Sequence, residues 1–225
     1  MLANVRMFVF DMAGTTVNEK GLVYKTLQDT FKNFGIKIPE EEFGRFYGMQ
    51  KTEVISTVVD MVPHVPEENK VKIYDKFKVD LKKNYMKKGN LEPMEGSFEL
   101  FSFLRSKNIK VCLNTGFDQE MANYVIDSVD FRNHIDSVVC SSEVSKGRPQ
   151  PFMIKKLMGL HDIVNPSEVV KVGDTTLDIL EGKNAQTLCQ FAVLTGEEKE
   201  ESILKSNPTH VFKDLKDLHN FLKEK

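Results

Sequence analysis

The sequence lacks three features that would assign it to a special class: many cysteines, a long apolar run and a large net charge. Three cysteines among 225 residues are an odd, sparse set, which argues against a disulfide framework and fits a reducing cytoplasm. A formal net charge of −2 gives no general reason to bind nucleic acid or a membrane surface. No apolar run approaches the roughly 18 residues of a transmembrane helix, and the N-terminus is not typical of a secretion signal. We therefore expect a cytoplasmic protein, monomeric or homodimeric.

Short apolar runs rich in strand-forming residues alternate with helical patterns along much of the chain, which is long enough to bury a sizeable core. The strand-like runs are 5–10, 109–113, 137–140, 169–172 and 191–194. The helical patterns between the later runs are 98–106, 119–129, 151–160 and 176–184. This alternation predicts an α/β protein with a Rossmann-like parallel sheet covered by helices on both faces.

The stretch from about residue 21 to residue 89 differs from the rest, because it holds long amphipathic patterns and no convincing strand. Four segments are typical of helices: 22–33, 40–47, 51–61 and 67–88. We predict an all-helical cap domain over residues 18–90, inserted into a core domain of residues 1–17 and 91–225. The hinges should lie near residues 17–21 and 88–93, where the chain is polar and contains glycine or proline.

Polar residues follow several of the predicted strands, where ligands bind in an open parallel sheet. The first strand ends in Asp11-Met12-Ala13-Gly14-Thr15-Thr16, and a later one in Asn114-Thr115-Gly116. Another runs into Gly173-Asp174-Thr175-Thr176-Leu177-Asp178, and Ser145–Pro151 opens a helix. Phosphoryl transfer needs such parts: a carboxylate nucleophile, oxygen ligands for magnesium, and a hydroxyl and a cation for the phosphoryl oxygens. Each part alone is weak, but their joint occurrence after strands favours a phosphohydrolase.

These segments resemble the four motifs of the haloacid dehalogenase superfamily, and they cover nearly the whole chain. Three details are similar to phosphonoacetaldehyde hydrolases (phosphonatases) and the phosphonatase-like group. Ala13 stands where most phosphatases of the superfamily carry a second aspartate, and Arg148 stands where most carry lysine. The segment Gly48-Met49-Gln50-Lys51 matches the spacing of the phosphonatase cap lysine.

The resemblance implies a Mg²⁺ site and a covalent intermediate. Asp11 would be the nucleophile and a metal ligand. The backbone carbonyl of Ala13 and the side chain of Asp174 would be further ligands, and Asp178 would orient metal-bound water. The substrate would be a small organic phosphate or phosphonate, cleaved through an aspartyl-phosphate.

The resemblance also implies which groups hold the phosphoryl oxygens. Thr115, with the amide of Gly116, would bind them, and Arg148 would neutralise both Asp11 and the phosphoryl group. Lys146 lies close by in sequence, but we expect it on the surface.

Ala13 cannot protonate a leaving alkoxide, as the second aspartate does in the common phosphatases. Either the leaving group needs no proton or another group supplies it. In phosphonatases a cap lysine forms an imine (a Schiff base) with the substrate aldehyde, and Lys51 is the candidate here. Lys51 could instead contact phosphate or substrate, or lie on a helix surface.

Several departures from the phosphonatase pattern favour a different substrate. Val54 stands where that group has histidine, and Phe117 stands where it has tyrosine. The position of a cysteine in that group corresponds to about Gly21. Three hypotheses stay open: a phosphonatase-like phosphohydrolase, a phosphonoacetaldehyde hydrolase using a Lys51 Schiff base, and a catalytically weak binding protein on the same fold.

Overall fold

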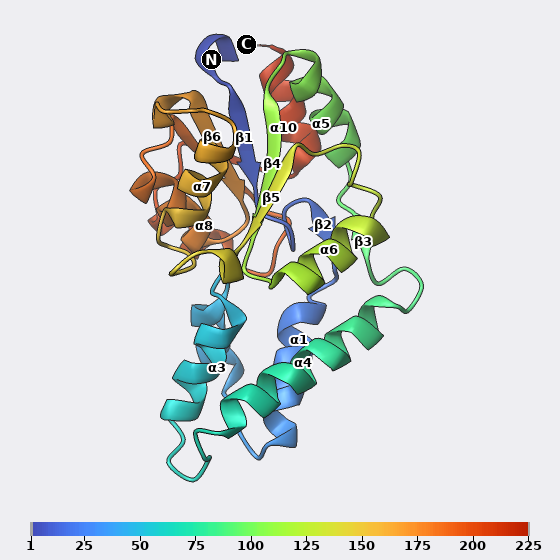
Figure 1. Ribbon diagram of the computed structural model, residues 1–225, viewed down its shortest axis with the longest axis vertical. Helices are drawn as coiled ribbons and strands as arrows, with labels where there is room; N and C mark the ends of the chain where they lie inside the picture. The colour runs from blue at the N-terminus through green and yellow to red at the C-terminus, as the bar shows by residue number, and fades with distance from the viewer. Residues whose placement is uncertain (1, 225) are drawn as a thin grey trace.

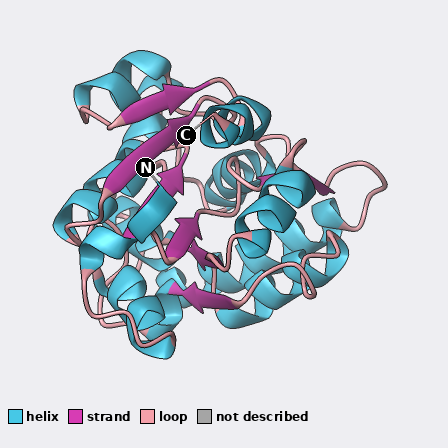
Figure 2. Ribbon diagram, turned by 90° about the horizontal axis from the view of Figure 1, so that it is seen from above, coloured by secondary structure: helices cyan, strands magenta, loops and turns pink. Residues whose placement is uncertain are grey.

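The computed structural model describes residues 2–224, and its centre is a parallel sheet of six strands in the order β5-β4-β1-β6-β7-β8. The strands are β1 (Met7–Phe10), β4 (Lys110–Thr115), β5 (Ser137–Cys140), β6 (Val169–Gly173), β7 (Cys189–Val193) and β8 (His210–Phe212). All four residues of β1 are buried, because the sheet has helices on both faces (Figure 2). The predicted α/β architecture is confirmed, with β8 as an additional edge strand.

Alternate residues of β1 point into two different cores. Phe8 and Phe10 pack with residues of α5, α6 and α10, whereas Met7 and Val9 pack with residues of α7. This period of two is that of a strand buried on both faces. The helices that accompany the sheet are α5 (Ser97–Ser106), α6 (Gln119–Ser128), α7 (Phe152–Leu160), α8 (Thr176–Asn184), α9 (Glu200–Lys205) and α10 (Leu215–Lys223). Single 3₁₀ turns lie at Leu2–Asn4, Ser141–Glu143 and Pro166–Glu168.

The segment between β2 and β3 is helical, and Figure 1 shows it below the sheet, on the side toward which β1 runs from the N-terminus. Its elements are α1 (Leu22–Asn33), α2 (Glu40–Phe43), a 3₁₀ turn (Gly44–Phe46), α3 (Lys51–Asp60) and α4 (Asn69–Tyr85). Two predicted helices are too long. The one over 40–47 changes to 3₁₀ at Gly44, a poor helix former, and the one over 67–88 is shorter at both ends.

Both links between the sheet and the helical segment belong to one small ribbon. Strand β2 (Val17–Asn18) pairs antiparallel with β3 (Glu92–Pro93), with Val17 opposite Pro93 and Asn18 opposite Glu92. The two predicted hinge regions are therefore tied side by side. The division into residues 1–17 and 91–225 and residues 18–90 stays a prediction, with this ribbon lying at both of its boundaries.

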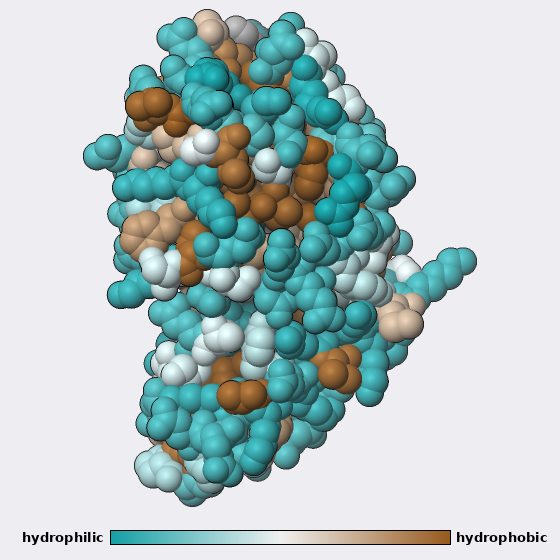
Figure 3. All heavy atoms as spheres, in the orientation of Figure 1, coloured by the Kyte–Doolittle hydropathy of each residue, from teal (hydrophilic) through white to brown (hydrophobic). Residues whose placement is uncertain are grey.

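The surface over α1, α3 and α4 is largely hydrophilic, and its hydrophobic side chains are scattered (Figure 3). Within residues 2–224, none of the helices has the length and apolarity needed to traverse a bilayer. Cys112, Cys140 and Cys189 are free and buried. Burial raises the pKa of the Cys140 thiol to about 12, as expected of an unreactive core thiol.

Candidate active site

Three carboxylates meet at the carboxyl ends of β1 and β6. Asp11 follows β1, Asp174 follows β6, and Asp178 lies in the first turn of α8. Each offers one oxygen, and these oxygens lie within 4.8 Å of one another. All three residues are buried. We call this group the acidic cluster, and it contains the carboxylates that the sequence nominated as metal ligands.

The register of the sheet places Asp11 beside Asp174. Phe10 lies opposite Val172 in the neighbouring strand, and the Asp11 N–H continues the pairing with a 3.0 Å hydrogen bond to the Val172 carbonyl. The Thr15 hydroxyl then donates to Asp174 Oδ1 at 2.7 Å. Gly196 lies so close to the Asp174 carboxylate that even a Cβ atom there would clash. Asp174 is therefore held from both sides.

Asp178 is oriented by the start of its own helix. The Thr175 hydroxyl and N–H both donate to Asp178 Oδ2, at 2.6 and 3.2 Å. Thr175 in turn caps the helix by accepting from the Asp178 N–H, which makes a reciprocal capping box. This capping fixes Oδ2 of Asp178. The other oxygen, Oδ1, faces the cationic side chains of Arg148 and Lys171.

Arg148 joins the acidic cluster to the neighbouring strand. Its Nη2 atom lies 2.5 Å from Asp11 Oδ1 and donates to the Asn114 carbonyl at 2.9 Å. Its Nε atom lies 3.2 Å from both Asp178 Oδ1 and Glu181 Oε2. A guanidinium is suited to this position because its planar fork of donors can serve several acceptors at once.

A lysine and a glutamate complete the network beneath the site. Lys171 Nζ lies 2.9 Å from Asp178 Oδ1, 3.2 Å from Glu181 Oε2 and 2.6 Å from Asn114 Oδ1. Asn114 Nδ2 also donates to both Glu181 oxygens at 2.9 Å. Sequence reasoning missed these residues. The available signal was a lysine among valines in a buried strand, which requires a buried partner, and a glutamate one helical turn after Asp178.

The three carboxyls of the acidic cluster titrate differently. Burial, reinforced by the charge of Asp11, raises the pKa of Asp174 well above its usual value. Burial also raises the pKa of Asp11, and Arg148 opposes the rise. For Asp178, burial is outweighed by Arg148 and Lys171, which hold its pKa below the usual range. Asp174 is thus the carboxylate with the least compensated charge.

The charges of this network fit one divalent cation. The network has four carboxylates and two cations: Asp11, Asp174, Asp178, Glu181, Arg148 and Lys171. When all six groups are ionised, the four carboxylates exceed the two cations by two, so two further positive charges are needed for neutrality. Among residues 2–224, none forms an ion pair with Asp174, although the other three carboxylates all have one. Buried oxygen ligands with that deficit suit Mg²⁺.

The end of β4 and the loop that follows it bring two predicted phosphoryl-binding groups, Thr115 and Gly116, to the same place. Thr115 is buried, and its Oγ1 accepts a 3.2 Å hydrogen bond from the Phe117 N–H, which leaves the hydroxyl proton to donate elsewhere. The Ser141 hydroxyl holds the loop by donating to the Gly116 carbonyl at 3.1 Å.

Lys51 is the contribution of the helical segment. It begins α3, is buried, and donates to the Met49 carbonyl at 2.8 Å. Its Nζ atom lies 4.8 Å from the centre of the Tyr24 ring. Burial lowers the pKa of Lys51 to about 8, although the charges of Asp11, Glu19 and Asp174 oppose this shift. Its amine is therefore partly neutral near physiological pH.

Residues from the sheet and the helical segment line one small cavity of about 30 Å³. Its walls are Asp11, Ala13, Val23, Tyr24, Gly48, Lys51, Thr115, Gly116, Phe117, Arg148 and Thr175. Most of the predicted site residues are in this set, and Asp174 lines an adjoining cavity with Ala13 and Glu19. Lys146 is exposed, as expected.

Glu19 is a second buried group that sequence reasoning missed. Its Oε2 atom accepts a 2.7 Å hydrogen bond from the Val23 N–H at the start of α1, and the Tyr85 hydroxyl lies 3.5 Å away. Burial raises the pKa of Glu19 to about 7. The carboxyl caps a helix next to the ribbon that joins the two parts of the chain.

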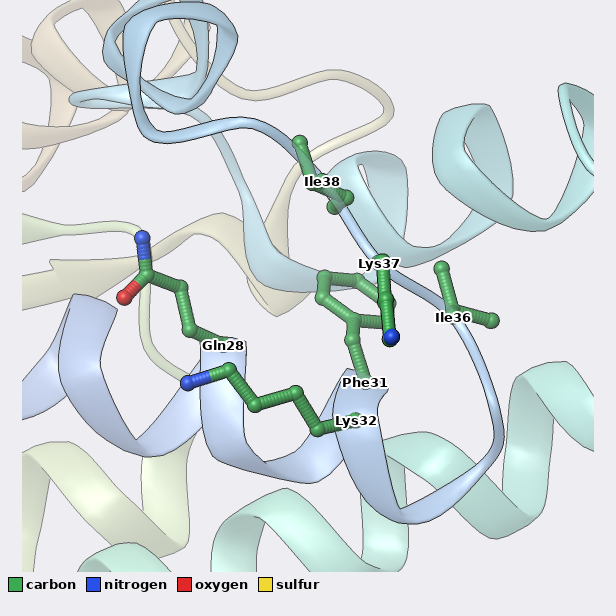
Figure 4. Close-up of a pocket in the computed structure, with 6 residues that line it drawn as sticks. All are labelled: Gln28, Phe31, Lys32, Ile36, Lys37 and Ile38. Atoms are coloured by element: carbon green, nitrogen blue, oxygen red, sulfur yellow. The ribbon is translucent and has the colours of Figure 1, made fainter.

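A larger cavity lies in the helical segment, and its lining has no groups suited to catalysis. Its volume is about 310 Å³, and it lies between the end of α1 and the segment that follows it (Figure 4). It is lined by Gln28, Phe31, Lys32, Ile36, Lys37 and Ile38. No carboxylate or hydroxyl is among these residues, so this cavity is not a candidate active site.

Comparison with known proteins agrees with this geometry. The family model described as haloacid dehalogenase-like hydrolase matches residues 8–192. The phosphonoacetaldehyde hydrolase of Lactiplantibacillus plantarum is 29% identical over 199 residues, which are 82% of this chain and 74% of that protein. That of Bacillus cytotoxicus is 29% identical over 194 residues, 80% of this chain and 73% of its own.

Solved structures share the fold. A hydrolase from Pseudomonas syringae has a TM-score of 0.86 at 19% identity, with 97% of this chain and 98% of the other covered. A phosphonoacetaldehyde hydrolase like protein from Oleispira antarctica has a TM-score of 0.84 at 21% identity, with 99% and 93% covered. The predicted architecture is thus confirmed by relatives as well as by the strand order.

Proposed function

The chain belongs to the family of haloacid dehalogenase-like hydrolases, and from that premise we propose a magnesium-dependent phosphohydrolase that acts on a small organic phosphate or phosphonate. The observation that carries the proposal is the convergence of Asp11, Asp174 and Asp178 within 4.8 Å, with Arg148 on Asp11. The phosphonoacetaldehyde hydrolases to which the chain is similar agree with this reaction class.

Asp11 is the nucleophile in this proposal. One of its oxygens attacks phosphorus, the bond to the leaving group breaks, and water then hydrolyses the aspartyl-phosphate to free phosphate and the original carboxylate. Arg148 holds the carboxylate at its Oδ1 atom and balances charge there. The Thr115 hydroxyl and the Gly116 amide would hold phosphoryl oxygens during the transfer.

Asp11, Asp174, Asp178 and the backbone carbonyl of Ala13 are the groups that would hold Mg²⁺, with Asp178 as the one that orients metal-bound water. When bound, the ion supplies positive charge that stabilises the phosphoryl oxygens. The raised pKa of Asp174 and its lack of an ion pair among the described residues support this assignment.

The helical segment is proposed as a cap over residues 18–90 that completes the site with Lys51. Closing the cap excludes water and strengthens the electrostatic interactions inside. Lys51 would face the substrate from the cap, because it lines the same cavity as Asp11 and Thr115. Its contact with a phosphoryl oxygen or with the leaving group would select the substrate.

Asp11→Asn is the direct test of this function. We expect Mg²⁺-dependent phosphate release from a panel of small phosphates and phosphonates by the wild type, and its loss in the variant. An Asp11→Asn protein that turns over substrate at the wild-type rate would exclude the nucleophile. Beryllium fluoride, which mimics an aspartyl-phosphate, should bind the wild type only with Mg²⁺. Failure to bind would favour the alternative of a catalytically weak binding protein.

A second candidate function is phosphonoacetaldehyde hydrolysis with a Lys51 Schiff base. It is favoured by the burial of Lys51, its lowered pKa and the curated relatives of that name. Val54 and Phe117 argue against it, because both are apolar where phosphonatases carry histidine and tyrosine. Borohydride treatment with phosphonoacetaldehyde would trap an adduct on Lys51 if this reaction occurs. Absence of an adduct, with turnover retained in Lys51→Ala, would leave an ester phosphatase.

A further inference from the structure

Lys171 and Glu181 form a buried ion pair underneath the proposed active site. Both side chains are fully buried, and Lys171 Nζ lies 3.2 Å from Glu181 Oε2. Neither residue lines the cavity that contains Asp11 or the adjoining one that contains Asp174. Their place in the fold therefore gives them no contact with a substrate, and any effect on the reaction has to pass through other residues.

Each member of the pair contacts the machinery on a different side. Lys171 lies 2.9 Å from Asp178 Oδ1, and Glu181 lies 3.2 Å from Arg148 Nε. Asn114 links both, because it accepts from Lys171 and donates to Glu181. Burying charges is costly unless they are paired and hydrogen-bonded, and here every contact leads to a residue of the site or to Asn114.

The pair also fixes the charge that the acidic cluster presents. With Lys171 and Glu181 both present, the network of six ionised groups lacks two positive charges. Without the charge of Lys171, the network would need three positive charges for neutrality. Without the charge of Glu181, it would need one. Lys51 is left out of this count because none of the ion pairs among the described residues joins it to the network. Its amine does act electrostatically on Asp11 and Asp174, but that effect is common to the wild type and to variants at Lys171 or Glu181.

We infer that Lys171 and Glu181 are positioning residues that set the charge of the acidic cluster to the value that one divalent cation neutralises, while holding Arg148 and Asp178 in place. This inference rests on the proposed function for its assignment of Asp11, Asp174 and Asp178 to Mg²⁺. It adds that two residues without contact to ion or substrate determine how tightly the ion is held.

The test is calorimetric titration of the metal-free protein with MgCl₂, which needs no substrate. Glu181→Gln removes one negative charge at nearly constant shape and should weaken Mg²⁺ binding about tenfold or more. Lys171→Met removes one positive charge and should tighten binding by a similar factor. The double variant should return close to the wild-type affinity, because the net charge is restored. A merely structural role would weaken binding in both single variants.

Matched controls carry the same substitutions outside the network. Lys110→Met and Glu168→Gln remove charges from partly exposed surface pairs, with Asp136 and Arg6, and should leave the Mg²⁺ affinity unchanged. Circular dichroism would verify that each variant is folded. If Lys171→Met does not fold, the comparison of Glu181→Gln with the double variant still decides, since removing both partners of a buried pair is better tolerated than removing one.

Two results would overturn the inference: weaker binding in both single variants, or a double variant that binds no better than Glu181→Gln. Either result, with Mg²⁺ binding and Asp11-dependent turnover intact in the wild type, would leave the proposed function standing. A wild type that binds no Mg²⁺ and turns over without it would instead remove the proposed function.

Discussion

Arg148 Nη2 lies 2.5 Å from Asp11 Oδ1, although 137 positions separate the two residues in the chain. The contact closes the site between β1 and the loop that precedes α7. A lysine in place of Arg148 would keep the charge, but it would lose the planar fork in which Nη2 contacts Asp11 and Asn114 while Nε contacts Glu181.

The first prediction follows from this geometry. Arg148→Met should lower kcat by about 10²–10³, the usual cost of losing a preorganised donor at a developing charge. Arg148→Lys should fall between this variant and the wild type, because it retains charge without the fork. Steady-state phosphate release at saturating Mg²⁺ measures both. An Arg148→Lys protein with wild-type kcat would show that the fork is dispensable.

The second prediction concerns Asp174, whose pKa burial and Asp11 raise well above the usual value. A carboxyl whose pKa is higher in the folded state destabilises the fold once pH exceeds its unfolded pKa. Asp174→Asn should therefore raise the Tm of the metal-free protein at pH 7. The same variant should lose the Tm increase given by Mg²⁺, which for a ligand at 100 times its Kd is about 2.7 kcal/mol of stability.

These two effects of Asp174→Asn have opposite signs, which separates them from general damage to the fold. Thermal unfolding with EDTA and with MgCl₂ provides both measurements. A variant that is less stable in EDTA, or that keeps the full response to MgCl₂, would contradict the assignment of Asp174 as a metal ligand.

Much of the fold and the central site could be predicted from the sequence because both are encoded by local patterns. The runs around Phe8 and Val170 are apolar and short, and each ends in an acidic residue. In a parallel sheet the carboxyl ends of the strands lie at one edge, so Asp11 and Asp174 were expected at the same edge. The pairing of β1 with β6 then makes them neighbours. The structure brings them together with Asp178 and Arg148, as that argument expects.

The residues that were missed depend on contacts distant in sequence. Glu181 is an ordinary helical glutamate until its neighbours Arg148 and Lys171 are known, and Glu19 is an ordinary loop residue until Tyr85 packs beside it. Element ends also depend on context, as the early end of α2 before Gly44 illustrates. Pattern reveals which residues are apolar or acidic, but not which distant side chain satisfies a buried charge.

The third prediction uses the Lys51 amine, whose pKa burial lowers to about 8. If the ammonium form contacts the substrate phosphate, kcat/KM for an ester should fall as pH rises through about 8. The groups that act electrostatically on this amine are Asp11, Arg148, Glu19 and Asp174. Lys51→Arg, which stays charged, should keep its activity to higher pH. Lys51→Met should no longer show the fall in kcat/KM near pH 8. A kcat/KM that rises through pH 8 would instead support the Schiff base.

The fourth prediction concerns Glu19, whose pKa burial raises from 4.5 to about 7. Between these values the folded state binds more protons than the unfolded state, so stability falls as pH rises from about 5 to 7 and stays lower above. Glu19→Gln keeps an oxygen to accept from the Val23 N–H and removes the charge. It should be more stable than the wild type at pH 8, by as much as roughly 3 kcal/mol, because a rise of about 2.5 pKa units is worth about 1.4 kcal/mol per unit.

Denaturant unfolding at pH 5 and pH 8, in EDTA, measures this difference. The gain should vanish at pH 5, where the wild-type carboxyl is protonated in the folded protein. A gain of equal size at both pH values would mean that packing, and not ionisation, explains it.

The fifth prediction concerns the close contact at Gly48 between the helical segment and the start of α8. Its φ is +76°, and a Cβ atom there would lie 2.5 Å from Thr175 Oγ1 and 3.1 Å from Leu177 Cβ. Gly48→Ala should therefore strain the backbone, at a cost of about 1–3 kcal/mol, and push the loop that leads to Lys51 away from Thr175. We expect a lower Tm and a kcat/KM reduced about tenfold or more.

Gly44→Ala is the matched control for Gly48→Ala, because Gly44 lies four residues earlier in the same segment and has helical backbone angles. A Cβ atom at Gly44 would meet only the Tyr47 ring, at an ordinary 3.7 Å. The control should keep wild-type turnover, since an added methyl group there fits without a clash. If both variants behave alike in Tm and kcat/KM, close seating of this loop on Thr175 is not what brings Lys51 to the site, and the cap would act through its other contacts.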